Sequence, residues 1–210
     1  VGATGSGKTT VVNLLTRFYD IDGGSITLDG ESIYDIPKKK LRGSIGIVLQ
    51  DTVIFNDTIM QNIRYGRLDA TDEEVIAAAK TAKVADFAEK MADGYDTMLT
   101  EGGGNLSQGQ RQLIAIARAV LADPKILILD EATSSIDTRT EVHIQEAMLA
   151  LMKGRTSLII AHRLSTIRDA DKIVVIDGGK VVEAGNHEKL LSENGAYARL
   201  YNTQFAGIKT

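Results

Sequence analysis

Four residues at the start of the chain have the types and the spacing that bind phosphate. Gly2, Gly7, Lys8 and Thr9 fill the fixed positions of the pattern G-x-x-x-x-G-K-[ST]. Glycines allow backbone N–H groups to turn inward around an anion, the lysine reaches the β- and γ-phosphates, and the threonine hydroxyl ligates Mg²⁺. A helical run follows and directs its N-terminus at the phosphates. The loop and the first helical turn therefore predict a nucleotide site with these contacts: Gly2, Thr4, Gly5, Ser6, Gly7, Lys8, Thr9 and Thr10.

Two adjacent carboxylates end an apolar run at residues 126–129 that has the length of a buried strand. Acidic side chains at the end of such a strand are costly unless a cation or a reacting group needs them. Asp130 is placed to hold Mg²⁺ opposite Thr9, and Glu131 to act as general base on the attacking water. The alternative is a strand that simply ends in solvated acids. The phosphate loop in the same chain favours the functional interpretation.

A histidine, His162, follows a second apolar run at residues 158–161. In an open parallel sheet the carboxyl ends of the strands line one crevice, so this histidine should meet the side chains that end the other strands: Gln50, Asp130 and Glu131. Its expected task is to contact the γ-phosphate and to hold the attacking water in line with the base. A lone histidine is more often a surface or core residue, and we assign no role to His143 or His187.

The order of the elements predicts an α/β protein, a P-loop NTPase with a mostly parallel sheet flanked by helices. The expected elements are a helix after the loop, a hairpin turning at residues 29–30, strands at 45–49, 126–130 and 156–161, helices at 107–121 and 139–152, a hairpin at 172–184, and two short helices in the tail. Residues 51–104 are expected to form a mostly helical insertion, with a capping box at Thr71 and Glu74 and a helix at residues 84–91. We interpret residues 1–210 as one domain.

Composition narrows the class of protein. Hydrophobic residues make up 43% of the chain and charged residues 25%, as in ordinary soluble domains. The net charge of −4 argues against a protein that binds nucleic acid through a basic face, and the lack of cysteine excludes disulfides and thiol chemistry. No apolar run approaches the roughly 18 residues of a membrane span. Only Val1 precedes the phosphate loop, so we expect the N-terminal strands of the fold to be truncated.

A second glycine-flanked loop, residues 105–110, also leads into a helix. A helix N-terminus of this kind can bind an anion by itself. Because the first loop already accounts for the phosphates of one nucleotide, we infer that the second loop serves a nucleotide held by another copy.

Taken in order, these motifs resemble the nucleotide-binding domain of an ABC ATPase over essentially the whole chain. The resemblance implies that Gln50 is the Q-loop glutamine, a catalytic residue and a Mg²⁺ contact with Thr9 and Asp130. It implies that residues 134–137 form the D-loop and that His162 is the switch histidine, catalytic with Lys8 and Glu131. In this family two domains pair head-to-tail and sandwich ATP between one P-loop and the partner's signature loop, here Ser107, Gln108, Gly109 and Gln110.

Three segments resemble those of exporters within the family: residues 51–59, 62–66 and 100–104, the last like the X-loop. In exporters such segments touch coupling helices of the membrane domain. The resemblance therefore implies an ATP-binding and ATP-hydrolysing motor domain of an exporter, with ATP and Mg²⁺ as ligands. Its partners would be a transmembrane domain and a second nucleotide-binding domain, and its place would be the cytoplasmic face of the membrane.

The sequence departs from the family pattern at Gln108, where a glycine is usual. The same change resembles one half of heterodimeric bacterial exporters, the half that retains Glu131 and His162, but homodimers can carry it too. The aromatic residue that stacks on adenine precedes the P-loop in this family, so we assign none. Two alternative functions have less support. A soluble ABC protein of DNA repair or translation would be expected to show a heptad run or a basic stripe, and the sequence has neither. A scaffold that binds ATP without hydrolysing it would not need the intact Glu131 and His162.

Overall fold

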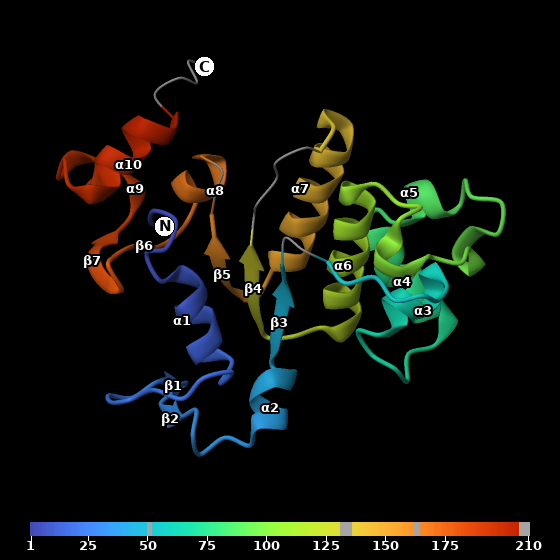
Figure 1. The fold of residues 1–210 in the computed structure, drawn as a ribbon, viewed down its shortest axis with the longest axis horizontal. Helices are drawn as coiled ribbons and strands as arrows, with labels where there is room; N and C mark the ends of the chain where they lie inside the picture. Colours follow the sequence, from blue (N-terminus) through green and yellow to red (C-terminus); the bar gives the residue numbers. More distant parts are fainter. Residues whose placement is uncertain (50–51, 131–135, 162–163, 206–210) are drawn as a thin grey trace. The chain divides into compact units, whose positions relative to one another are not determined.

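The computed structural model describes residues 1–49, 52–130, 136–161 and 164–205 (Figure 1). The chain divides into two compact units, one formed by Val1–Leu41 with Ile160–Thr210 and the other by Arg42–Ile159. The phosphate loop belongs to the first unit, and the loop that leads into the helix at residue 108 belongs to the second.

The N-terminal part of the first unit begins with helix α1 (Lys8–Leu15), directly after the phosphate loop. Strands β1 (Thr27–Leu28) and β2 (Glu31–Ser32) then pair antiparallel, as expected for two short runs joined by Asp-Gly. Both turn residues have positive φ, 51° at Asp29 and 87° at Gly30, which suits the right-handed twist of a hairpin.

The C-terminal part of the first unit is built around a second hairpin. Strands β6 (Ile173–Asp177) and β7 (Lys180–Gly185) pair antiparallel, and the turn between them consists of Gly178 and Gly179, both with positive φ. Helix α8 (Leu164–Arg168) precedes the hairpin, and helices α9 (His187–Ser192) and α10 (Ala196–Phe205) follow it. The carboxylate of Glu183 on β7 accepts the backbone N–H groups of Ala196 and Tyr197, so the hairpin caps α10.

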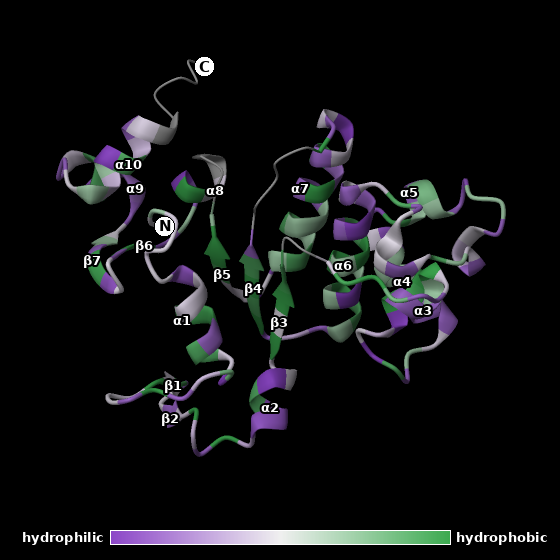
Figure 2. Cartoon of the chain, in the orientation of Figure 1, coloured by the Kyte–Doolittle hydropathy of each residue, from purple (hydrophilic) through white to green (hydrophobic). Residues whose placement is uncertain are grey.

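The second unit contains a sheet with the strand order β3–β4–β5. Strands β3 (Ile45–Val48) and β4 (Ile126–Asp130) run parallel with Ile45 opposite Ile126, and β5 (Thr156–Ile160) lies on the other side of β4. Figure 2 shows all three strands as mostly hydrophobic, which is the pattern of strands covered on both faces. The three strands expected from the apolar runs are therefore present, with ends that agree within one residue.

Two long helices pack beside each other in this unit, α6 (Gln108–Ala122) and α7 (Thr138–Met152) (Figure 1). The apolar spacing along α6 predicts an inward face of five side chains. Four of them are buried and the fifth, Val120, packs partly buried against the same core: Leu113, Ile114, Ile116, Ala117 and Val120. Helix α6 ends at Asp123, which adopts the left-handed conformation just before Pro124, and proline cannot continue a helix.

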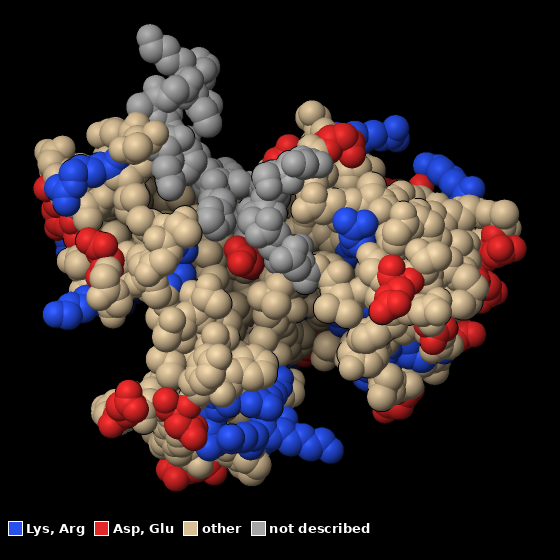
Figure 3. Space-filling view, in the orientation of Figure 1, with Lys and Arg blue, Asp and Glu red and all other residues tan. Residues whose placement is uncertain are grey.

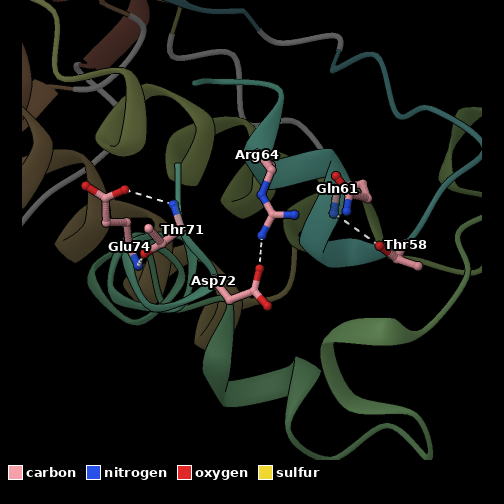
Figure 4. A network of polar contacts seen from close by, with 6 residues as sticks. All are labelled: Thr58, Gln61, Arg64, Thr71, Asp72 and Glu74. Atoms are coloured by element: carbon pink, nitrogen blue, oxygen red, sulfur yellow. Dashed lines mark hydrogen bonds and ion pairs between the residues drawn. The ribbon is translucent and has the colours of Figure 1, made fainter. Parts of the chain in front are cut away.

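The rest of the second unit consists of short helices: α3 (Ile59–Arg64), α4 (Asp72–Thr81), α5 (Ala85–Ala88) and the 3₁₀ turns Gly94–Asp96 and Glu101–Gly103. Figure 4 shows their caps and ties: Thr58 accepts the N–H of Gln61, Thr71 and Glu74 form the expected capping box, and Arg64 pairs with Asp72. Helix α5 is shorter than the expected 84–91 because the chain tightens into i→i+3 bonds after it. That residues 51–104 form a subdomain of their own stays a prediction.

The surface carries both signs of charge. Figure 3 shows basic side chains gathered over helix α2 (Lys38–Gly43), where three lysines and Arg42 are exposed. These basic side chains form a local patch on a chain whose net charge is −4. Among the described residues, no helix combines the length and the apolar character that crossing a bilayer requires.

Candidate nucleotide-binding site

The phosphate loop has the backbone of an anion cradle. Three of its glycines have positive φ: 155° at Gly2, 79° at Gly5 and 108° at Gly7. Gly7 is the N-cap of α1, and no side chain caps the helix there. The free N–H groups of the first turn and the helix dipole thus remain available to a negatively charged ligand, as expected from the sequence.

The loop is held from behind by the hairpin of the same unit. The N–H of Ile176 donates to the carbonyl of Val1 at 2.9 Å, and the N–H of Gly179 donates to the carbonyl of Ser6 at 3.0 Å. The approach is so close that a Cβ on Gly2 would lie 2.3 Å from the carbonyl oxygen of Ile176. Gly2 is therefore required both by its φ and by its neighbours.

The side chains of the loop fit a phosphate. The ammonium of Lys8 folds back over the loop and donates to the carbonyls of Gly2 at 2.7 Å and Ala3 at 2.8 Å. Ser6 is buried, and its hydroxyl has no hydrogen-bond partner among the described residues, although a buried polar group normally has one. Thr9 and Thr10 are exposed in the first turn of α1. A cation, an unpaired hydroxyl and accessible threonines suit a nucleotide phosphate and its metal ion.

Replacing Gly2 with alanine is expected to weaken ATP binding by about tenfold or more, because the new methyl group would push the loop off the hairpin. Calorimetric titration with Mg-ATP measures the change. Gly23→Ala is the matched control, since a Cβ there would meet nothing within 4 Å. Equal affinities of Gly2→Ala and the wild type would show that the loop does not depend on this contact.

Of the residues expected at the carboxyl ends of the strands, one is described. Asp130 ends β4, directly after the buried Leu129, and is partly exposed. Gln50, Glu131 and His162 lie outside the described residues, so their convergence stays a prediction. The same holds for a joint Mg²⁺ site of Thr9, Gln50 and Asp130. A hydroxyl, an amide oxygen and a carboxylate are nevertheless the oxygen ligands that Mg²⁺ prefers.

The loop before α6 contains a capping box that the sequence analysis missed. Ser107 Oγ accepts the N–H of Gln110 at 3.2 Å, and Gln110 Oε1 accepts the N–H of Ser107 at 2.9 Å. The spacing Ser-x-x-Gln is a known signal for such a box, so the sequence held this information. The cap uses a lone pair of the Ser107 oxygen and leaves its O–H free to donate, while Gln108 is partly buried and Gly109 buried.

Arg118 in α6 joins three segments of the second unit and was not singled out from the sequence. Its guanidinium donates to the carbonyl of Val53 at 2.6 Å, to the carbonyl of Asn62 at 2.6 Å and to Asn62 Oδ1 at 2.7 Å. Asn62 is buried and bonds in turn to both backbone groups of Phe55. Burial lowers the pKa of the Arg118 guanidinium from its usual value, yet arginine stays charged at neutral pH.

An aromatic pair lies over this arginine. The rings of Phe55 and Tyr65 are 4.5 Å apart, and the Arg118 guanidinium is 5.2 Å and 5.9 Å from their centroids. Tyr65 is 58% exposed and the neighbouring Val53 66%, so the group presents apolar surface on an otherwise polar exterior. We call Val53, Phe55 and Tyr65 the aromatic surface.

The fold and the phosphate loop together define an ATP-binding domain of the ABC type. The profile of the family described as ABC transporter matches residues 1–134, and the chain belongs to this family. Its relatives place it among the ATP-binding domains of exporters. An uncharacterized ABC transporter ATP-binding protein of Bacillus subtilis, YfiC, is 59% identical over 98% of this chain and 34% of its own length. An ATP-dependent lipid A-core flippase of Hahella chejuensis is 56% identical over 98% of this chain and 35% of its own.

A solved structure gives the same result for the fold. A bacterial Atm1-family ABC exporter with ATP bound matches with a TM-score of 0.90 and 48% identity, over 100% of this chain and 36% of that chain. The expected fold class and family are therefore confirmed. The chain spans about a third of the length of these relatives.

Proposed function

We propose that this domain binds and hydrolyses Mg-ATP and drives an ABC exporter, with a transmembrane domain as its partner. The observation that carries the proposal is the phosphate loop: an uncapped helix N-terminus, the ammonium of Lys8 over the loop and the buried, unpaired hydroxyl of Ser6. Relatives named as a lipid A-core flippase and a fatty acid transporter support a lipid-like, amphipathic cargo. Such a domain works at the cytoplasmic face of the membrane.

Different residues bind the phosphates, hold the metal ion and activate the attacking water. The amides of the loop and Lys8 bind the β- and γ-phosphates and stabilise the charge that develops on them. Thr9, Gln50 and Asp130 would hold Mg²⁺, which when bound neutralises phosphate charge. Glu131 accepts the proton of the attacking water, and His162 holds this water in line.

A second nucleotide-binding domain completes the site. In the proposed head-to-tail pair, the O–H of Ser107 donates to a phosphate oxygen of the nucleotide on the partner's P-loop, helped by the N-terminus of α6. Ser107 is exposed, and its capping box leaves this donor free. Closure of the pair excludes water and so gates hydrolysis. Gln108 is compatible with an identical or a different second domain.

The aromatic surface is the proposed contact with the transmembrane domain. Its residues lie in the segments 51–59 and 62–66 that resemble those of exporters, and they are anchored to α6 through Arg118. A movement of the aromatic surface would therefore be transmitted through Arg118 to α6, the helix that begins at the signature loop, residues 106–110. This connection supports the coupling of hydrolysis to transport.

Replacing Lys8 with alanine tests the proposed function. Loss of the ammonium should weaken ATP binding by roughly a hundredfold and abolish measurable phosphate release, because a charge-assisted contact to two phosphates is removed. Lys39→Ala, which removes an exposed lysine of α2, is the control and should behave as wild type. Undiminished hydrolysis by the Lys8→Ala protein would refute the assignment of this loop.

A further inference from the structure

The first turns of α6 and α7 meet at Gly109. A Cβ built on this glycine would lie 2.2 Å from Thr140 Cγ2, 3.3 Å from Thr140 Cβ and 3.2 Å from Ile136 Cγ2. No side chain fits such a space, since even one methyl group would overlap a neighbour. The Cβ direction points at α7 and not away from the chain. Thr140 of the same chain therefore requires a glycine at position 109.

The methyl group that faces Gly109 is held in a fixed place. Asp137 caps α7 and accepts the N–H of Thr140 at 3.0 Å. This backbone hydrogen bond is the main cause that lowers the pKa of the Asp137 carboxyl. A branched threonine side chain has few χ1 rotamers in a helix, so the capped backbone of this first turn limits where Cγ2 points.

We propose that Thr140 is a positioning residue for the signature loop. Held by Asp137, it sets the spacing between the start of α6, which carries Ser107 and Gly109, and the start of α7, which carries Asp137. The first turns of α6 and α7 then move together, and a displacement of either one displaces the other. The inference rests on the proposed function, because it concerns how Ser107 is presented to the nucleotide of the second domain.

The test is a double-mutant cycle in the full-length exporter in lipid, with Gly109→Ala, Thr140→Ser and the double variant. Serine at position 140 keeps the hydroxyl and the backbone N–H that Asp137 accepts, and removes only the methyl group that lies 2.2 Å from the built Cβ. Each protein is measured for melting temperature, binding of a fluorescent ATP analogue to the P-loop, and kcat of ATP hydrolysis.

Gly109→Ala alone should lower kcat by about tenfold or more, because the signature loop is displaced, and should lower the melting temperature by roughly 5 °C. Its affinity for the ATP analogue should fall much less than kcat, since Lys8 and the P-loop amides make most of the proposed phosphate contacts; a merely destabilised protein would lose binding and turnover together. Thr140→Ser alone should lower kcat measurably but by less than Gly109→Ala, because the methyl group that spaces the two helix starts is lost and nothing overlaps. The double variant should recover kcat to within about threefold of wild type, since its remaining contacts of 3.2 and 3.3 Å relax easily.

Two results would overturn the proposal. The first is full activity of Gly109→Ala. The second is that the double variant loses as much activity or stability as Gly109→Ala alone. The second result would mean that the glycine serves a ligand or backbone role unrelated to Thr140. A wild-type protein that hydrolyses no ATP would instead refute the proposed function, so the two failures are distinguishable.

Discussion

Replacing Glu131 with glutamine is expected to leave ATP bound and to lower its turnover by about 10²–10⁴-fold, the usual contribution of a general base. Glutamine has nearly the same shape as glutamate but cannot accept the proton of the attacking water. The position directly after β4 and Asp130 supports this role, because the carboxyl ends of parallel strands carry the reacting groups in such folds. Phosphate release under saturating Mg-ATP measures the loss.

The same variant tests the pairing of two domains, because bound ATP should trap the closed state. Spin labels on the ATP-binding domains of the full-length Glu131→Gln protein, read by electron paramagnetic resonance with and without Mg-ATP, follow the distance between these domains. Closure between identical domains would show that Gln108 tolerates a homotypic pair, and its failure with ATP bound would point to a different partner. Glu89→Gln, an exposed acid, is the control. Near-wild-type turnover of Glu131→Gln would exclude this residue as the base.

Replacing Arg118 with alanine is expected to lower the free energy of unfolding by about 3 kcal/mol, one of the largest effects in the chain. The change leaves the carbonyls of Val53 and Asn62 and the side-chain oxygen of Asn62 without their donor. It also removes the cation beneath Phe55 and Tyr65. Thermal unfolding should show a melting temperature lower by roughly 6–12 °C.

Arg118→Lys separates the charge from the geometry of this contact. A lysine keeps the positive charge, but its single ammonium cannot match the fork that reaches three oxygens, so we expect a loss between those of alanine and wild type. Lys39→Ala should leave the melting temperature unchanged. If lysine at position 118 were as stable as arginine, the three hydrogen bonds would not account for the stability.

Local signals in the sequence were sufficient for most elements. The apolar run at 126–129 and its acidic end predict β4, apolar residues at helical spacing predict α6, and Asp-Gly predicts the first hairpin. In each case the residues that decide the structure lie within one turn or one strand of each other. The phosphate loop is predictable for the same reason, since its conformation follows from its own glycines.

Contacts between distant segments could not be predicted in this way. Arg118 and Asn62 are separated by 56 residues, and nothing in the periodicity of either helix marks them as partners. The contact of Gly109 with Thr140 could not be predicted for a different reason. The signature motif of the family already explains a glycine at position 109, so the sequence gives no sign that Thr140 also requires it.

The hairpin that holds the phosphate loop is synthesised long after the loop itself. The nitrogen of Val1 donates to the carbonyl of Val174 across 173 positions of sequence, and Gly179 supports Ser6 in the same way. A ribosome that adds roughly 5–20 residues per second needs about 10–30 s to cover this distance. The nucleotide cradle therefore matures only when nearly the whole domain has been synthesised. ATP can stabilise the finished domain but cannot guide the early folding of its nascent chain.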